Sequence, residues 1–153
     1  VSAGGNSNNN LTIEAANDTG SIIVGAINRN GTKAGFSNYG SRVSIAAFGN
    51  DLYTLYGPNG KFGSFGGTSG ATPQVAGTVA MMLEINPDLT PAEVKDILVE
   101  TRETNDTNKT VGGQLNVLRT IKRTMETLDD NDQTLRTEKA QMLDFRKKLL
   151  EIL

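Results

Sequence analysis

The first third of the chain alternates short apolar runs with turn sequences. Residues 21–27 (SIIVGAI) form a nearly continuous apolar run, which is typical of a β-strand buried on both faces. Residues 33–37 (KAGFS) and 42–48 (RVSIAAF) predict two more short strands, because polar and glycine-containing turns bound each of them. This pattern predicts a sheet built from short strands.

The next segment has the pattern of a β-hairpin. Residues 51–56 (DLYTLY) and 61–66 (KFGSFG) alternate apolar and polar positions and carry aromatic side chains. The sequence GPNG lies between them, and its Asn59-Gly60 pair favours the positive φ angles of a tight hairpin turn. A plain surface loop is the alternative interpretation.

From Thr68 the pattern becomes helical. Residues 71–85 (ATPQVAGTVAMMLEI) are apolar nearly all round, which predicts a central helix buried on most sides. Pro73 fits a helix best in its first turn, so we expect Ser69 at or just before the helix start. Gly77 costs about 1 kcal/mol relative to alanine inside a helix, and a closely packed neighbouring backbone would explain it.

A second helix has clear start signals. Thr90 and Glu93 have the spacing of a capping box, and Pro91 occupies the first helical position. An apolar stripe follows at helical spacing, formed by Val94, Ile97 and Leu98. Residues 105–113 (NDTNKTVGG) then predict a polar loop, and residues 114–121 (QLNVLRTI) resume the helical pattern.

The segment 125–153 differs in composition, being charged and rich in helix-forming residues. Apolar residues recur in it at intervals of seven, with a second row beside them: Leu128, Leu135, Met142 and Leu149, then Phe145 and Ile152. This pattern predicts an amphipathic helix that either self-associates as a coiled coil or lies on its own domain. Polar residues interrupt the second row, which favours the helix lying on its own domain.

Composition excludes several classes of protein. The formal net charge of −2 disfavours a nucleic-acid partner bound by bulk electrostatics. The absence of cysteine excludes disulfides and thiolate metal sites. No stretch approaches the roughly 18 apolar residues of a membrane span. The chain opens with VSAGGNS, which resembles the end of a strand whose beginning is missing, so we expect a fragment.

Ser69 has surroundings suited to chemistry. A serine before a helix is most often an N-cap. Here Gly66, Gly67, Gly70 and Ala71 remove bulk around Ser69, and a helix N-terminus favours negative charge developing beside its hydroxyl. A serine nucleophile needs a base, however, and the chain contains no histidine.

The stretch 67–73 (GTSGATP), followed by Val75-Ala76-Gly77, closely resembles the nucleophile signature of subtilisin-like serine peptidases. Residues 2–7 (SAGGNS) are similar to the family's oxyanion segment, and residues 21–40, 86–102 and 112–121 agree with it in the right order. The resemblance covers residues 1–124 and leaves 125–153 as a helical extension. It implies an α/β fold, part of a three-layer subtilisin-like architecture with a mainly parallel sheet, plus a C-terminal amphipathic helix.

The resemblance also implies roles for individual residues. Ser69 would be the nucleophile, and Asn6 would donate its side-chain amide to the oxyanion with support from Thr68. Ala3, Gly4 and Gly5 would form a substrate-facing strand edge and one wall of the specificity pocket. The implied partner is a peptide or protein substrate. No cofactor is evident, no metal ligand set is recognised, and calcium sites of the family cannot be assigned to residues here. Gln74 departs from the family, which commonly has a non-catalytic histidine there.

The family order of the catalytic triad is Asp, then His, then Ser. A chain that starts just before the oxyanion asparagine would lack the first two residues, so we expect a serine endopeptidase fragment that is inactive alone. Its expected partner is the missing N-terminal half of the domain, and residues 125–153 would allow self-association. A catalytically inactive binding or assembly module is the alternative. Export from the cell is favoured by the resemblance only.

Overall fold

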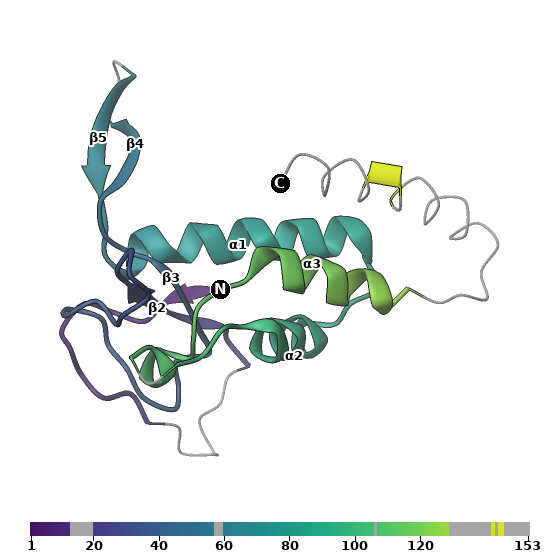
Figure 1. Cartoon of the computed structure of the whole chain (residues 1–153), viewed down its shortest axis with the longest axis horizontal. Coiled ribbons are helices and arrows are strands. Elements are labelled where there is room, and N and C mark those ends of the chain that lie inside the picture. The colour runs from purple at the N-terminus through teal and green to yellow at the C-terminus, as the bar shows by residue number, and fades with distance from the viewer. Residues whose placement is uncertain (13–19, 57–59, 106, 129–141, 143, 146–153) are drawn as a thin grey trace.

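The computed structural model describes residues 1–12, 20–56, 60–105, 107–128, 142 and 144–145 (Figure 1). Its centre is a parallel sheet in the order β1 (Ser2–Ala3), β2 (Ile23–Ile27) and β3 (Ile45–Phe48). The strands predicted within 21–27 and 42–48 are therefore confirmed. The α/β class with a mainly parallel sheet is confirmed as well.

The prediction of a strand over residues 33–37 is wrong. Lys33 makes only an isolated antiparallel bridge to Ile27. The N–H of Ser37 donates to the carbonyl oxygen of Ala34 at 2.9 Å, which closes a turn inside the segment. Ala34 is buried in the larger core and Phe36 packs against it, so the burial of these residues does not require an extended strand.

Strand β2 is buried on both faces, as its continuous apolar sequence predicts. Val24 and Ala26 face the helices and join the larger core with residues of α1 and α2. Ile27 faces the other way and packs with Val43, Ala46 and Val111. This second face is covered in the described part of the chain by loops and by the short 3₁₀-helix η2 (Lys109–Val111).

The hairpin prediction is confirmed. Strands β4 (Leu52–Tyr56) and β5 (Lys61–Phe65) pair antiparallel, with Leu55 opposite Phe62. The hairpin projects from the body of the molecule (Figure 1). Gly60 has a φ of 63°, as the tight turn requires, while Asn59 lies outside the described residues.

Helix α1 (Thr68–Ile85) departs from the sequence expectation in two ways. It begins at Thr68, so Pro73 lies in its second turn and Ser69 is its second residue. Side chains donate to carbonyls around the resulting gap in the helical hydrogen bonds: Thr72 Oγ1 to Thr68 O at 2.7 Å, and Gln74 Nε2 to Gly70 O at 3.0 Å. Neither bond reaches the Ser69 carbonyl, which is the acceptor that loses its helical N–H donor at Pro73.

The prediction that α1 is buried on most sides is also wrong for the described structure. One face is buried, with Val75 and Met82 fully so, while Met81 and Leu83 are exposed. Nothing lies within 4 Å of a side chain placed at Gly77, so no described backbone packs closely there. Helix α1 therefore carries more apolar side chains than the described residues bury.

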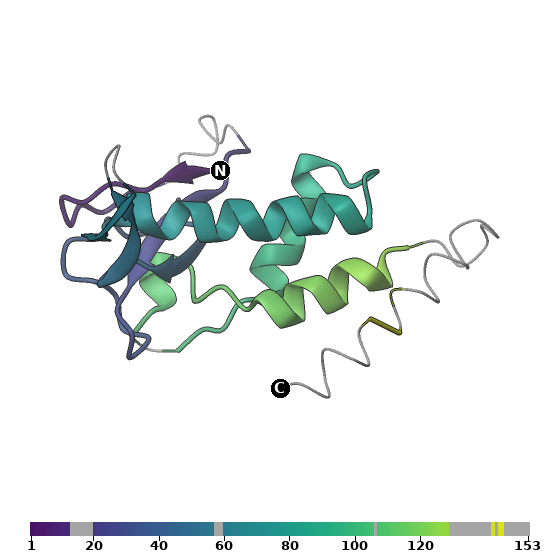
Figure 2. The ribbon, with the colours of Figure 1, turned by 90° about the horizontal axis from the view of Figure 1, so that it is seen from above.

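Helix α3 (Val117–Glu126) packs against α1, and helix α2 (Pro91–Thr101) packs against α3 (Figure 2). The capping box is confirmed, because Thr90 Oγ1 accepts from the Glu93 N–H while the Glu93 carboxylate accepts from the Thr90 N–H. The predicted stripe on α2 is buried. Most of 125–153 lies outside the described residues, and no described helix is long and apolar enough to cross a membrane.

Candidate functional site

The candidate site lies where the segment after β1 meets the first turn of α1. Two glycines make this approach possible. Gly5 has a φ of 97° and Gly67 a φ of 80°, both in the region that favours glycine. A side chain at Gly5 would lie 2.5 Å from Asn38 Nδ2, and one at Gly67 would lie 3.0 Å from Asn6 Nδ2. The two backbone turns are therefore restricted to glycine by both conformation and space.

Thr68 connects the two segments through three hydrogen bonds. Its backbone N–H donates to Asn6 Oδ1 at 2.9 Å, and its hydroxyl donates to the same oxygen at 3.0 Å. The hydroxyl also accepts from the Gly5 N–H at 3.1 Å. Because Thr68 is fully buried, these bonds exchange little with water.

The same bonds fix the orientation of the Asn6 carboxamide. Both donors of Thr68 require an acceptor, so the oxygen of Asn6 must face Thr68 and the NH₂ group must face the other way. No hydrogen-bond partner for Asn6 Nδ2 is present among the described residues, and Asn6 is exposed. The amide nitrogen is thus available as a donor beside the start of α1.

Asn38 is a residue that the sequence reasoning missed. Its side-chain oxygen accepts from the N–H groups of Ser7 (3.1 Å) and Asn9 (2.8 Å), and its amide donates to Gly4 O at 2.8 Å. Its backbone N–H donates to Gly5 O at 2.9 Å. These four bonds bracket Asn6 in sequence, so Asn38 positions the loop that carries it. The only sequence signal was that Asn38 lies within the stretch 21–40, which agrees with the family resemblance.

Ser69 is exposed at the second position of α1. An N–H at this position has no acceptor within its own helix, so the backbone N–H of Ser69 is available to a ligand. Next to it, a side chain at Gly70 would lie 2.6 Å from Leu52 Cδ1, so the base of the hairpin packs against this turn. Within the described residues no hydrogen bond engages the Ser69 hydroxyl.

Ala3, Gly4 and Gly5 lie at an edge of the described sheet. Ser2 and Gly4 donate their N–H groups to β2, at 2.9 Å to Ile22 O and 2.8 Å to Val24 O. Because strand residues alternate in direction, the N–H and C=O of Ala3 point away from β2 toward the open edge. The Gly4 carbonyl oxygen accepts from the Asn38 side chain, and the Gly5 N–H donates to the Thr68 hydroxyl.

The charged groups do not form a metal or acid–base centre in the part of the chain that the structure describes. No group of three or more Asp, Glu, His or Cys side chains is positioned to hold a metal there. The carboxylates Glu14 and Asp18 lie outside that part. The chemistry of this site therefore rests on a hydroxyl, a carboxamide and backbone N–H groups.

Comparison with known proteins agrees with this geometry. The profile of the subtilase family matches residues 1–128. Subtilisin NAT of Bacillus subtilis subsp. natto is 41% identical over 80 residues, covering 52% of this chain and 21% of the relative. The cell wall-associated protease of Bacillus subtilis (strain 168) is 36% identical over 114 residues, covering 74% of this chain and 13% of the relative.

Solved structures give the same result. A protease from Pseudoalteromonas arctica PAMC 21717 superimposes with a TM-score of 0.69 at 28% identity, covering 80% of this chain and 41% of that one. The patellamide maturation protease gives a TM-score of 0.66 at 27% identity, covering 81% of this chain and 50% of that one. The chain thus spans at most about half the length of these relatives.

Proposed function

Because the chain belongs to the subtilase family, we propose that it supplies the nucleophile and the oxyanion donors of a serine endopeptidase site. The observation that carries the proposal is the pair of hydrogen bonds from Thr68 to Asn6 Oδ1. They turn the Asn6 NH₂ group outward beside the helix start that bears Ser69. An amide donor fixed before the reaction begins stabilises developing negative charge without reorganisation.

In the proposed reaction, Ser69 Oγ attacks the carbonyl carbon of a peptide bond. The carbonyl electron pair moves to oxygen, where the Asn6 NH₂ and the Ser69 N–H donate hydrogen bonds. The positive end of the α1 dipole adds to this stabilisation. The amine leaves, an ester forms on Ser69, and water then hydrolyses it.

The Ser69 proton must pass to a base and from that base to the departing amine, and this chain contains no histidine. We propose that a histidine and its aspartate come from polypeptide outside residues 1–153, the remaining half of the family's domain. Without them the Ser69 hydroxyl stays protonated and the chain alone is inactive. The open edge at Ala3 suits the substrate, because an extended peptide can add to it as a strand.

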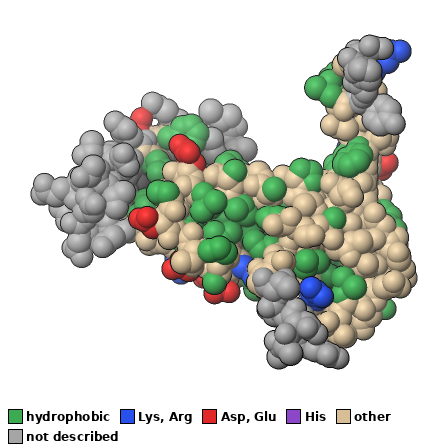
Figure 3. Space-filling model, turned by 180° about the vertical axis from the view of Figure 1, so that it is seen from behind, with side chains coloured by type: hydrophobic (Ala, Val, Ile, Leu, Met, Phe, Trp, Pro, Cys, Tyr) green, Lys and Arg blue, Asp and Glu red, His purple; other side chains and the backbone are tan. Residues whose placement is uncertain are grey.

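We propose that the remaining half of the domain docks on the uncovered face of α1. Leu83 is 39% exposed, and Ala76 and Ala80 are exposed on the same helix. Hydrophobic side chains gather on this side of the molecule (Figure 3). A cavity of about 250 Å³ lies beside it, lined by residues that include Val1, Val79 and Leu83. The aligned part of this chain makes up 41% and 50% of two solved relatives, so at least half of each relative lies outside the aligned part.

The test is active-site labelling with a fluorophosphonate, which reacts with activated serine hydroxyls. The protein should be tested in a form that includes the family's Asp and His, beside the 153-residue chain alone. We expect labelling of the longer form only, and its loss in Ser69→Ala. Ser64→Ala, an exposed serine on β5, is the matched control and should still label.

The outcomes distinguish the two functional hypotheses. Labelling that survives Ser69→Ala would remove Ser69 as the nucleophile. A well-folded longer form that is not labelled would support the alternative, a catalytically inactive binding or assembly module.

A further inference from the structure

An apolar groove runs between α1 and α3 on the side away from the sheet. It is a cavity of about 630 Å³ lined by Met81, Glu84 and Ile85 of α1 and by Ile121 and Met125 of α3. The remaining lining residues, Met142 and Phe145, come from the C-terminal segment. We propose that this groove is the docking site for the C-terminal segment of the same chain, with Met142 and Phe145 as its contact residues. The proposal is independent of the proteolytic function.

The burial pattern of α3 leaves apolar side chains partly exposed along the groove. Its buried residues are Thr120 and Thr124, and Thr120 Oγ1 lies 2.8 Å from Thr101 Oγ1 of α2. The polar face of α3 is thus turned into the body. Two of its apolar residues, Ile121 and Met125, remain only partly buried along the groove. Apolar surface in this position is stabilised by any segment that removes it from water.

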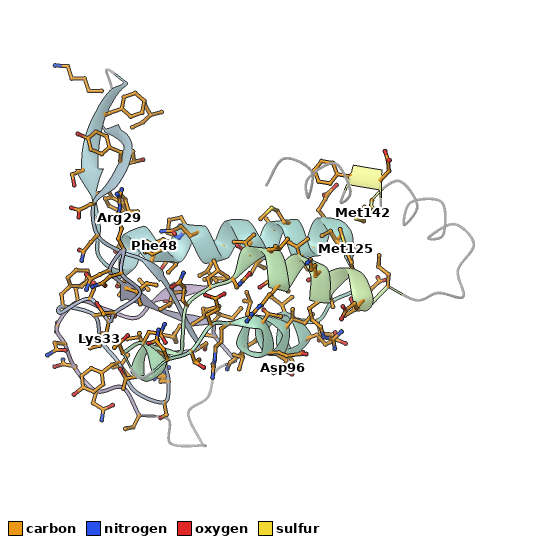
Figure 4. All side chains as sticks on the ribbon, viewed as in Figure 1. Arg29, Lys33, Phe48, Asp96, Met125 and Met142 are labelled. Atoms are coloured by element: carbon orange, nitrogen blue, oxygen red, sulfur yellow. The ribbon has the colours of Figure 1, made fainter. Side chains whose placement is uncertain are left out.

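Met142 and Phe145 suit this role by spacing and by chemistry. They are three residues apart in helical conformation, so they lie on one face of the segment. Phe145 keeps 62% of its surface exposed, which indicates a shallow contact. Methionine side chains adapt to irregular surfaces, so Met81, Met125 and Met142 fit such a contact well. Figure 4 shows Met142 and Met125 on the same side of the molecule.

The heptad row favours docking in the same chain over a coiled coil between chains. Its first member, Leu128, is 8% exposed and therefore belongs to the folded body. The neighbouring Thr127 accepts a hydrogen bond from Asn86 Nδ2 at 2.9 Å, which fixes the start of the segment at the end of α1. Leu128 is thus not available to a seam between two copies. Leu135 and Leu149 lie outside the described residues.

Crosslinking tests the proposal directly, because the chain has no cysteine of its own. The double variant Met125→Cys with Met142→Cys is treated with a short bismaleimide at low protein concentration. The control pair is Asp96→Cys with Met142→Cys, since Asp96 is on α2 and lies away from Met142 (Figure 4). A docked segment raises the effective concentration of the two thiols, so we expect the first pair to close within one chain at least roughly tenfold faster than the control.

Two further conditions make the result decisive. Urea should remove the difference between the pairs. Adding Met81→Asp, at an exposed position in the groove, should slow closure of the first pair while the helical circular dichroism stays unchanged. Crosslinked dimers as the main product would show self-association and overturn the proposal. Equal rates for the two pairs, or closure that Met81→Asp does not slow, would also overturn it.

Discussion

Thr68→Val tests whether the Thr68 hydroxyl holds the site together. Valine has nearly the shape of threonine but has no hydroxyl, so the change removes two hydrogen bonds with little change in packing. One is the bond to Asn6 Oδ1 at 3.0 Å, and the other is the bond that the Gly5 N–H donates at 3.1 Å. The backbone N–H of Thr68 would still donate to Asn6.

The magnitude follows from burial. Leaving the partly buried Gly5 N–H without an acceptor costs about 1–2 kcal/mol, and losing the bond to exposed Asn6 costs about 0.5–1 kcal/mol. We therefore expect Thr68→Val to lower the free energy of unfolding by about 1.5–3 kcal/mol. Thr78→Val is the matched control, because Thr78 is 1% exposed and its hydroxyl donates only to Gln74 O of its own helix, at 2.9 Å. It should cost roughly 0.5 kcal/mol, since the helical N–H still pairs with that carbonyl.

Urea unfolding followed by far-ultraviolet circular dichroism measures both variants at one temperature. Amide hydrogen exchange at Gly5 supplies a local measurement, and its protection should fall in Thr68→Val but not in Thr78→Val. Equal midpoints for the two variants, together with unchanged exchange at Gly5, would refute the role assigned to the Thr68 hydroxyl.

Four other changes test separate parts of the structure. Gly77→Ala should raise the free energy of unfolding by about 0.5–1 kcal/mol, because the helix gains propensity and a side chain there meets nothing within 4 Å. Gly49→Ala should lower it in the same urea assay, because the new methyl group would lie 2.5 Å from a side-chain carbon of β2. The pKa of Glu93 is lowered below 4.5, mainly by the hydrogen bond from the Thr90 hydroxyl and then by the one from the Thr90 N–H. Stability from this bond is complete above that pH and is lost as pH falls through the lowered pKa, so Glu93→Gln should flatten the acid limb of a pH titration of stability. In the active longer form, Asn6→Ala should lower kcat by about 10²–10³ in a peptide hydrolysis assay, a magnitude taken from subtilisin itself and not worked out for this chain. An unchanged kcat would remove Asn6 from the oxyanion site.

The elements that the sequence predicted well depend on local signals. The start of α2 follows from the capping box of Thr90 and Glu93, whose partners are three residues apart. The β4–β5 hairpin follows from its turn and its alternating pattern. Residues 33–37 have a similar apolar content, but the bond from Ser37 N–H to Ala34 O folds them into a turn. Composition alone does not distinguish these two outcomes.

The candidate site also contains some residues that local motifs predict and others that depend on long-range contacts. Ser69 and Asn6 could be proposed from short motifs, each contained within a few residues. The bonds that orient Asn6 come from Thr68, which is 62 residues away in sequence, and Asn38 acts on the loop from over 30 residues away. Thr68 was predicted only as support, and Asn38 was not predicted. Contacts of this range depend on how the strands are arranged, which no local pattern specifies.

That arrangement also changes the interpretation of the glycines around Ser69. The sequence indicated only that they remove bulk around Ser69. In the structure they bring together the carboxyl ends of the chain's own strands: the Gly49 N–H after β3 donates to Ile27 O at the end of β2, and the Gly67 N–H donates to Gly49 O at 2.7 Å. A side chain at Gly66 would lie 2.8 Å from Gly49 O. The start of α1 is thus tied to the ends of β2 and β3 by backbone contact, and through Thr68 to the segment after β1. Binding sites of open parallel sheets form at this edge, because successive strands end there together. The small residues near Ser69 therefore fix its helix in place, and the access that we propose for a substrate is the open edge beside Ala3.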